Sequence, residues 1–177
     1  QWHDGYGEFP AEDVRHSFWI LVQPTGKPSG VSTWRSIMGV KKGDDEATVT
    51  QRAEEVIEIA DDHTVKVHLG VVIPEVLFNV GKRRNLPIES KARWDAVGDE
   101  GMGEKMVGTG PFKFVERVEG SHVAYEAVDE HWRVVPQYKA LEIRSIEESS
   151  TRMAALLTEQ VHMAVIERAV QDQVTKK

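Results

Sequence analysis

The chain has 177 residues, of which 40% are hydrophobic and 29% charged, an ordinary balance for a folded protein with enough chain for a core. Its net charge of -7 and pI near 5.5 argue against a nucleic-acid partner, since phosphate binding requires clustered Lys and Arg. The absence of Cys excludes a disulfide framework and thiol chemistry, and no apolar run approaches the roughly 20 residues that a membrane-spanning helix needs.

A helix is the first predicted element. It starts at about Ala11, where apolar residues recur at helical spacing and two acidic residues occupy the first turn, and it ends before Pro24. The stretch 24–32 is rich in Pro, Gly and Ser and predicts a loop. A short helix over 34–38 follows, and then an acidic turn over 43–46.

A β-hairpin is predicted next. Its first strand begins at Val56, it turns at residues 61–62, and its second strand continues to Leu69. Because side chains alternate along a strand, Lys66 and His68 should share the face opposite the apolar residues.

The middle of the chain has weaker periodicity. A short helix is predicted over 74–80, and the polar stretch 82–103 is interpreted as a surface connection with one helix near Ala92. This composition places a domain boundary between about Ser90 and Met106.

The second half is expected to be a sheet followed by a helix. Strands over 112–118 and 123–127 form a hairpin around Glu119-Gly120-Ser121, and a third strand covers 141–146. Ser149 or Ser150 is expected to cap the helix that follows, and a further strand should lead to Val165.

Several short motifs resemble, in this order, those of the family 5 extracellular solute-binding proteins, the peptide- and nickel-type receptors of ABC importers. The resemblance extends from Trp2 to about Ile166. The residues that carry it are His3-Asp4-Gly5, Ala11-Glu12-Asp13-Val14, Asp61-Asp62-His63-Thr64-Val65, Val107-Gly108-Thr109-Gly110-Pro111-Phe112-Lys113-Phe114 and Ser150-Thr151-Arg152-Met153-Ala154-Ala155-Leu156-Leu157.

The resemblance implies a mixed α/β (α+β) fold that forms part of lobe I of a type II, cluster C periplasmic-binding-protein-like structure. Residues 1–90 would then be the C-terminal part of a small subdomain appended to lobe I, and residues 91–177 would be the hinge-side portion of that lobe. We therefore expect this chain to be a piece of a longer protein in which a second lobe follows.

In function, the resemblance implies a solute-binding component of an importer rather than an enzyme. Such a protein captures a small solute, with a peptide as the first candidate, and delivers it to ABC permease subunits at the periplasmic or outer face of the membrane. No cofactor and no metal site are expected. The piece alone should bind weakly, and its uncovered apolar surfaces should favour self-association.

Two residues are candidate ligand contacts. Trp34 follows the loop after the first helix, in a region where family members can bring an aromatic side chain towards the ligand, although packing in the core is the alternative. Thr109 lies between two glycines, where its hydroxyl could line a cleft. Neither this glycine pair nor Gly101-Met102-Gly103 completes a phosphate-binding motif, so tight turns are the preferred interpretation.

Other site chemistries are less well supported. The seven His residues lack zinc-ligand spacing, and residues 43–46 lack the alternating oxygen ligands of a calcium loop. Ser149 or Ser150 with His162 is the nearest candidate for a hydrolase pair, but no nucleophile elbow is present. A ligand-sensing domain of a transcription regulator remains the alternative function, which an upstream helix-turn-helix would indicate.

Overall fold

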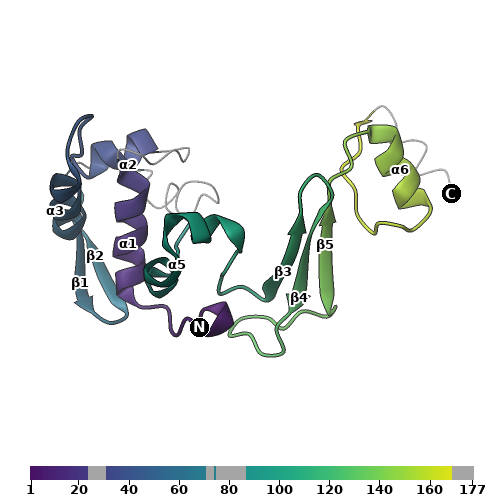
Figure 1. Ribbon diagram of the computed structural model, residues 1–177, viewed down its shortest axis with the longest axis horizontal. Helices are drawn as coiled ribbons and strands as arrows, with labels where there is room; N and C mark the ends of the chain where they lie inside the picture. Colours follow the sequence, from purple (N-terminus) through teal and green to yellow (C-terminus); the bar gives the residue numbers. More distant parts are fainter. Residues whose placement is uncertain (24–30, 71–73, 75–86, 169–177) are drawn as a thin grey trace. The chain divides into compact units, whose positions relative to one another are not determined.

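The computed structural model describes residues 1–23, 31–70, 74 and 87–168 (Figure 1). The described chain divides into two compact units, residues 1–109 (unit 1) and 110–177 (unit 2). In chain order the elements are η1 (His3–Gly5), α1 (Ala11–Val22), α2 (Val31–Ile37), α3 (Glu46–Val56), β1 (Ile57–Asp61), β2 (Thr64–Val67), α5 (Lys91–Glu104), β3 (Phe112–Val118), β4 (His122–Ala127), β5 (Ala140–Arg144) and α6 (Ser149–Leu157).

Helix α1 is the central element of unit 1, where it contacts α2, α3, α5 and both strands of the hairpin. It begins at Ala11 and ends at Val22, which confirms the prediction from apolar periodicity and from Pro24. Two acidic residues in its first turn lie at the positive end of the helix dipole. The helix buries Phe18 and Leu21 on the face that meets α2 and α3.

Helix α2 confirms the predicted short helix but begins at Val31, inside the stretch predicted as a loop, of which residues 24–30 lie outside the described residues. Helix α3 was not predicted. The acidic turn is in fact the start of α3, since Asp45 is the N-cap and its carboxylate accepts a hydrogen bond from the Thr48 amide at 2.8 Å. The helix buries Val49, Ala53 and Val56, which recur at helical spacing. The predicted strand start at Val56 was therefore wrong by one residue, because Val56 still belongs to the helix.

The hydrophobic core of unit 1 lies between α1, α2, α3 and the start of β1. Trp34 is 1% exposed and packs edge-on against Phe18, with ring centroids 4.9 Å apart. The other buried members are Leu21, Val22, Ile37, Met38, Val40, Val49, Ala53, Val56 and Ile57.

The predicted hairpin is confirmed as β1 and β2, which pair antiparallel from Ile57↔Val67 to Asp61↔Thr64. Lys66 and His68 both contact Glu58, at 2.8 and 2.7 Å, so they share the outer face as predicted. Strand β2 ends at Val67, two residues earlier than expected, but Leu69 still packs against the core.

Helix α5 confirms the predicted helix near Ala92. Ser90 caps it by accepting a hydrogen bond from the Arg93 amide at 3.2 Å, and Gly98, with φ 67°, interrupts it. The helix belongs to unit 1, which ends at Thr109. Apart from Pro74, the helix predicted over 74–80 lies outside the described residues.

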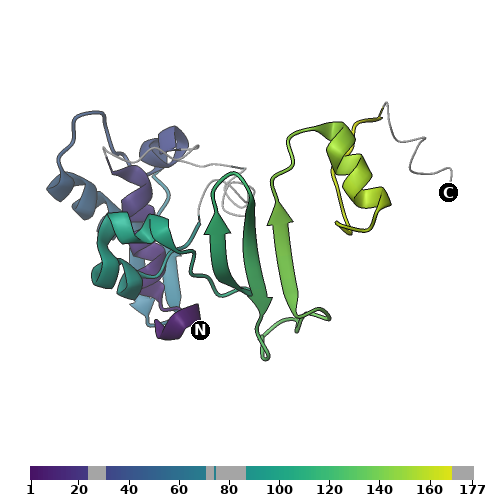
Figure 2. The ribbon, with the colours of Figure 1, turned by 45° about the vertical axis from the view of Figure 1, so that its right-hand side comes forward.

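Unit 2 begins with an antiparallel sheet in the order β3-β4-β5, visible as three adjacent arrows in Figures 1 and 2. The β3–β4 register runs from Phe112↔Ala127 to Val118↔His122, and Gly120, with φ 71°, lies in the connecting turn. The predicted hairpin is therefore confirmed. The third strand is also confirmed, as β5, but it ends at Arg144, two residues earlier than expected.

The end of the described chain corrects two expectations. The N-cap of α6 is Glu148, which makes no capping side-chain hydrogen bond, and the Ser149 hydroxyl is buried without a partner among the described residues. No strand follows within residues 158–168. Instead, Arg152 donates hydrogen bonds to the carbonyl oxygens of Ile146 and Val165, at 2.8 and 2.9 Å, and holds this segment without a ladder of strand hydrogen bonds.

Candidate functional site

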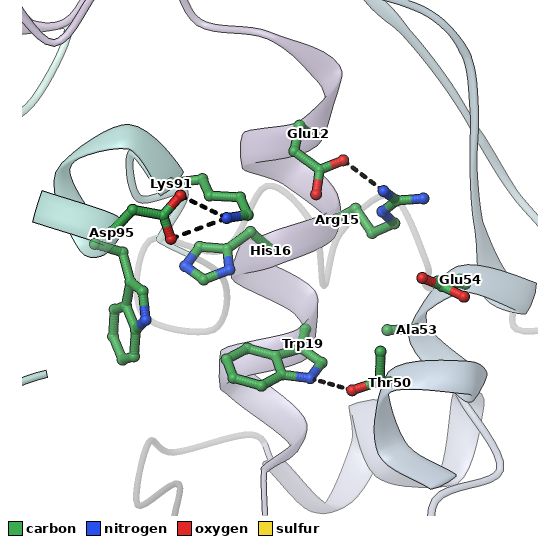
Figure 3. A pocket seen from close by; sticks show the side chains of 10 residues that line it. Glu12, Arg15, His16, Trp19, Thr50, Ala53, Glu54, Lys91 and Asp95 are labelled. Atoms are coloured by element: carbon green, nitrogen blue, oxygen red, sulfur yellow. Dashed lines mark hydrogen bonds and ion pairs between the residues drawn. The ribbon is translucent and has the colours of Figure 1, made fainter. Parts of the chain in front are cut away.

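A pocket of about 280 Å³ lies in unit 1 where α1, α3 and α5 meet (Figure 3). Each helix contributes one stripe of residues, because positions three and four apart lie on the same helical face. The lining consists of Glu12, Arg15, His16 and Trp19 from α1, Thr50, Ala53 and Glu54 from α3, and Lys91, Trp94 and Asp95 from α5.

Three aromatic rings form the apolar part of the pocket. The His16 imidazole stacks on Trp19 with centroids 5.6 Å apart and an interplanar angle of 16°, and it meets Trp94 edge-on at 5.3 Å and 71°. The Trp19 indole N–H donates a hydrogen bond to the Thr50 hydroxyl at 2.8 Å, which ties the ring to α3. A ligand in this pocket would therefore meet an indole ring anchored by a hydrogen bond.

The charged part of the pocket contains three carboxylates and two cationic side chains. Arg15 pairs with Glu12 at 2.6 Å, and Lys91 pairs with Asp95 at 2.7 Å. Glu54 makes no ion pair within the part of the chain that the structure describes, although Figure 3 shows it on the same side of the pocket as Arg15. The lining therefore has one more negative than positive charge.

His16 is 7% exposed, and its Nε2 atom is buried with no hydrogen-bond partner among the described residues. Burial lowers the pKa of His16 below its ordinary value of 6.5, and the nearby Lys91 ammonium lowers it further, while Asp95 and Asp13 oppose the shift. At neutral pH the ring is uncharged and contributes aromatic surface rather than positive charge.

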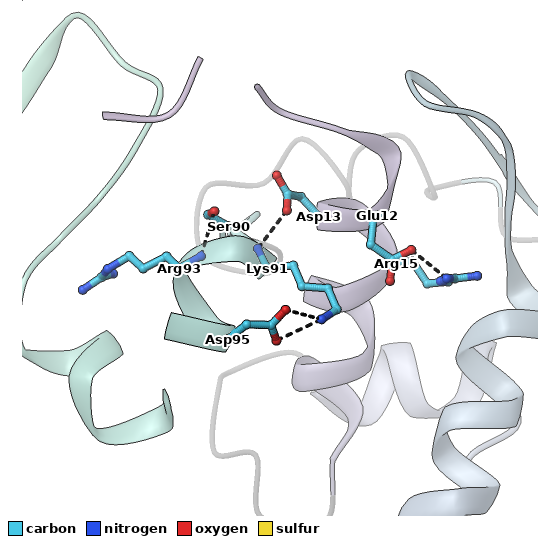
Figure 4. A network of polar contacts seen from close by, with 7 residues as sticks. All are labelled: Glu12, Asp13, Arg15, Ser90, Lys91, Arg93 and Asp95. Carbon is cyan, nitrogen blue, oxygen red and sulfur yellow. Dashed lines mark hydrogen bonds and ion pairs between the residues drawn. The ribbon is translucent and has the colours of Figure 1, made fainter. Parts of the chain in front are cut away.

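A buried polar network holds α5 against α1 beside the pocket (Figure 4). Asp13, only 2% exposed, accepts hydrogen bonds from the Trp2 indole N–H at 2.6 Å and from the Lys91 amide at 2.8 Å. One turn later, the Ser17 hydroxyl accepts a hydrogen bond from the Glu89 amide at 2.8 Å. Desolvation raises the pKa of Glu89, against the lowering effect of Arg93. The network fixes the start of α5 and thereby one wall of the pocket.

Neither predicted ligand contact lines this pocket. Trp34 lies in the core with 1% exposure, so its ring offers no surface to a ligand in this conformation. Thr109 is half-buried at the last position of unit 1, directly before the Gly110-Pro111 segment that leads into β3. The described contacts do not bring the two residues together.

The pocket residues escaped the sequence analysis for a specific reason. Glu12, His16 and Trp19 follow helical spacing and could have been recognised as one face of α1. The opposite wall, however, is formed by α3, and that helix was not predicted. The Thr50 partner of Trp19 therefore lies on a helix that the sequence did not predict.

The His residues and acidic turns make contacts of an ordinary structural kind. His63 lies 3.8 Å from Glu8, whereas His68 contacts Glu58, so these two His residues have different carboxylate partners. Asp44 accepts a hydrogen bond from the Lys41 amide at 2.8 Å. Within the described residues, no group of three or more His, Cys, Asp or Glu side chains is placed to hold a metal ion.

In the part of the chain that the structure describes, no helix combines the length and apolar character that crossing a membrane requires.

The family comparison covers the whole chain. The sequence model described as bacterial extracellular solute-binding proteins, family 5 Middle, matches residues 1–177. A comparison with curated proteins finds no match.

Solved structures share the fold. The Helicobacter pylori protein DppA, in complex with the peptide STSA, matches with a TM-score of 0.78 and 24% identity, over 99% of this chain and 35% of its own. Bacillus subtilis AppA, in complex with a nonapeptide, matches with a TM-score of 0.79 and 20% identity, over 99% of this chain and 32% of its own. Campylobacter jejuni NikZ, in complex with Ni(L-His), matches with a TM-score of 0.77 and 22% identity, over 99% of this chain and 32% of its own.

The chain thus spans about a third of the length of these proteins, and at such identities the likeness establishes the fold. The mixed helices and antiparallel sheets described above agree with part of a periplasmic-binding-protein fold. Together with the match over every residue, this shows that the chain belongs to the family 5 bacterial extracellular solute-binding proteins.

Proposed function

We propose that this chain is part of the solute-binding component of an ABC importer, with a peptide as the first candidate solute. The observation that carries the proposal is the family match over residues 1–177. Two of the similar structures contain bound peptides and a third contains a nickel–histidine complex, which supports a small polar solute and ranks a peptide first.

The mechanism that we propose for the whole protein is closure of two lobes around the solute, followed by docking on the permease. Closure places the solute between surfaces that neither lobe supplies alone, and the energy of these contacts favours the closed state. The whole protein would act outside the cytoplasmic membrane, in the periplasm or at the outer face, and would not be an enzyme.

The 177-residue chain by itself should bind the solute weakly, because it spans about a third of the length of the similar structures. Thr109 remains our candidate contact, because it is half-buried and lies between two glycines in the turn that leads into β3. For Trp34 to contact the solute, its side chain would have to leave the core of unit 1, so we rank it second.

A thermal-shift screen tests the proposal. The full-length parent protein and this chain are heated in parallel with di- to oligopeptides, nickel–histidine and oligosaccharides. A ligand that binds only the folded state raises the melting temperature by mass action. We expect a shift with peptides in the parent protein and little or none in this chain.

Other outcomes would change the proposal in defined ways. A shift with nickel–histidine or a sugar alone would replace the peptide by that solute. No shift in the parent protein, together with an upstream helix-turn-helix, would favour the regulator. A strong peptide shift in this chain alone would contradict the need for a second lobe.

A further inference from the structure

The pocket between α1, α3 and α5 is formed by residues of unit 1 alone, and the proposed function does not use it. Its volume of about 280 Å³ is close to the lower end of the range for small-molecule sites. It can therefore hold a small organic molecule but not a length of peptide. The chemistry of its lining indicates which class of molecule that would be.

The apolar lining favours a ligand that contacts aromatic faces. Trp19 and Trp94 are both half-buried, and each packs against the His16 ring between them. The Trp19 indole N–H already donates a hydrogen bond to Thr50, so this ring offers a ligand its π-surface rather than a hydrogen-bond donor. Indole faces attract cations through the ring quadrupole.

The charges of the lining favour a positive ligand over a negative one. Arg15 and Lys91 are each paired with a carboxylate on their own helix, so an anion would have to compete with an existing partner. Glu54 has no ion-pair partner in the described chain and can act as the counter-charge of a cation. Figure 3 shows Glu54 and Asp95 on opposite sides of the pocket.

We propose that this pocket is a binding site for a small organic cation with an alkylated ammonium group. The ammonium group lies against the indole rings of Trp19 and Trp94, and the Glu54 carboxylate balances its charge. The proposal does not depend on which solute the parent protein transports.

Isothermal titration calorimetry of the 177-residue protein tests the site with a matched pair of probes. Choline carries a quaternary ammonium group, and 3,3-dimethylbutan-1-ol has the same shape with a carbon atom in place of the nitrogen. We expect saturable binding of choline with a dissociation constant of about 1 mM or below. The uncharged alcohol should bind at least about tenfold more weakly, because it lacks the cation–π attraction.

Variants locate the binding in the pocket. Trp94→Leu should weaken choline binding about tenfold, and Glu54→Gln should weaken it about threefold. Trp132→Leu removes a 78% exposed indole in unit 2, and Glu100→Gln removes one negative charge from the exposed part of α5. Both controls should leave the dissociation constant within about twofold of its original value.

The proposal is overturned if the alcohol binds as tightly as choline. It is also overturned if choline gives no saturable heat at a concentration about twentyfold above the expected dissociation constant, or if the control variants lose as much affinity as the pocket variants. Should Trp94→Leu disturb the circular dichroism spectrum, the pair Glu54→Gln and Glu100→Gln decides on its own. If the parent protein binds no peptide, the result of this test does not change, because the titration measures choline binding to the 177-residue chain.

Discussion

Both units combine helices with an antiparallel sheet, but they differ in how much apolar surface they bury. Among the described residues, Phe114 and Ala155 are the only buried hydrophobic residues of unit 2, whereas unit 1 has a continuous core. Large apolar side chains in unit 2 are well exposed, and those above 50% are Val115, Trp132, Val134, Val135, Tyr138, Ile143, Met163 and Val165.

The difference follows from how many layers each unit has. In unit 1 three helices pack against α1, and α1 and α3 pack against the hairpin, so apolar stripes meet each other. In unit 2 a single sheet of three strands lacks a covering layer among its described contacts, and a sheet needs one to bury a face. Unit 1 is therefore the part that we expect to supply the stability of this chain.

Removing one indole from each unit should give the largest contrast. We expect Trp34→Ala to lower the free energy of unfolding by about 3–5 kcal/mol, because it leaves a cavity in the core. Trp132→Ala, at a side chain 78% exposed, should change it by less than about 0.5 kcal/mol. Urea unfolding followed by circular dichroism measures both, and equal losses would show that unit 1 does not carry the stability.

Removing a buried carboxylate should have the next largest effect. Asp13→Ala leaves the Trp2 indole N–H and the Lys91 amide without their acceptor, and we expect a loss of about 3 kcal/mol. Asp129→Ala, an exposed position in unit 2, is the matched control and should cost less than about 0.5 kcal/mol. The same urea titration serves, and a loss below about 1 kcal/mol for Asp13→Ala would mean that water replaces the lost acceptor.

Self-association should also differ between the units. If the exposed apolar surface of unit 2 drives it, Val135→Lys should raise the dissociation constant of the dimer about tenfold. Val97→Lys, at a position 39% exposed on α5 of unit 1, should leave it nearly unchanged. Light scattering over a wide concentration range measures both dissociation constants. If the unsubstituted 177-residue chain is strictly monomeric over that range, the expectation is refuted.

The smallest predicted effect is a pH dependence confined to unit 1. Because the pKa of His16 lies below 6.5 in the folded state, the unfolded chain takes up a proton first as the pH falls. The contribution of His16 to stability is therefore present above pH 6.5 and is lost as the pH falls through the folded pKa. His16→Gln should flatten this part of the stability profile.

The control is His162→Gln, at an exposed position in unit 2, which should leave the profile unchanged. Glu89 acts in the opposite direction, since its raised pKa makes the folded state lose stability as the pH rises above 4.5. This contribution is common to all three proteins and cancels in the differences. An identical slope in His16→Gln and the original chain would contradict the assignment to His16.

The sequence by itself determined the elements whose signals are local. Apolar spacing and Pro24 defined α1, alternation and turn residues defined both hairpins, and the order of short motifs pointed to the family. The start of α3 was also encoded, in the Asp45 cap, but the same residues are typical of a solvated turn. Local signals cannot separate the two meanings when the apolar stripe is only three residues long.

Only the tertiary structure decided which side chains meet. The sequence left open whether Trp34 faces a ligand or packs in the core, and its burial depends on the contact with Phe18 on another helix. The pocket required three helices at once, and the helix in its second wall was hidden in an acidic turn. Spacing along the chain fixes the face on which a residue lies, whereas the partner of that face is set by long-range packing, which no single segment contains.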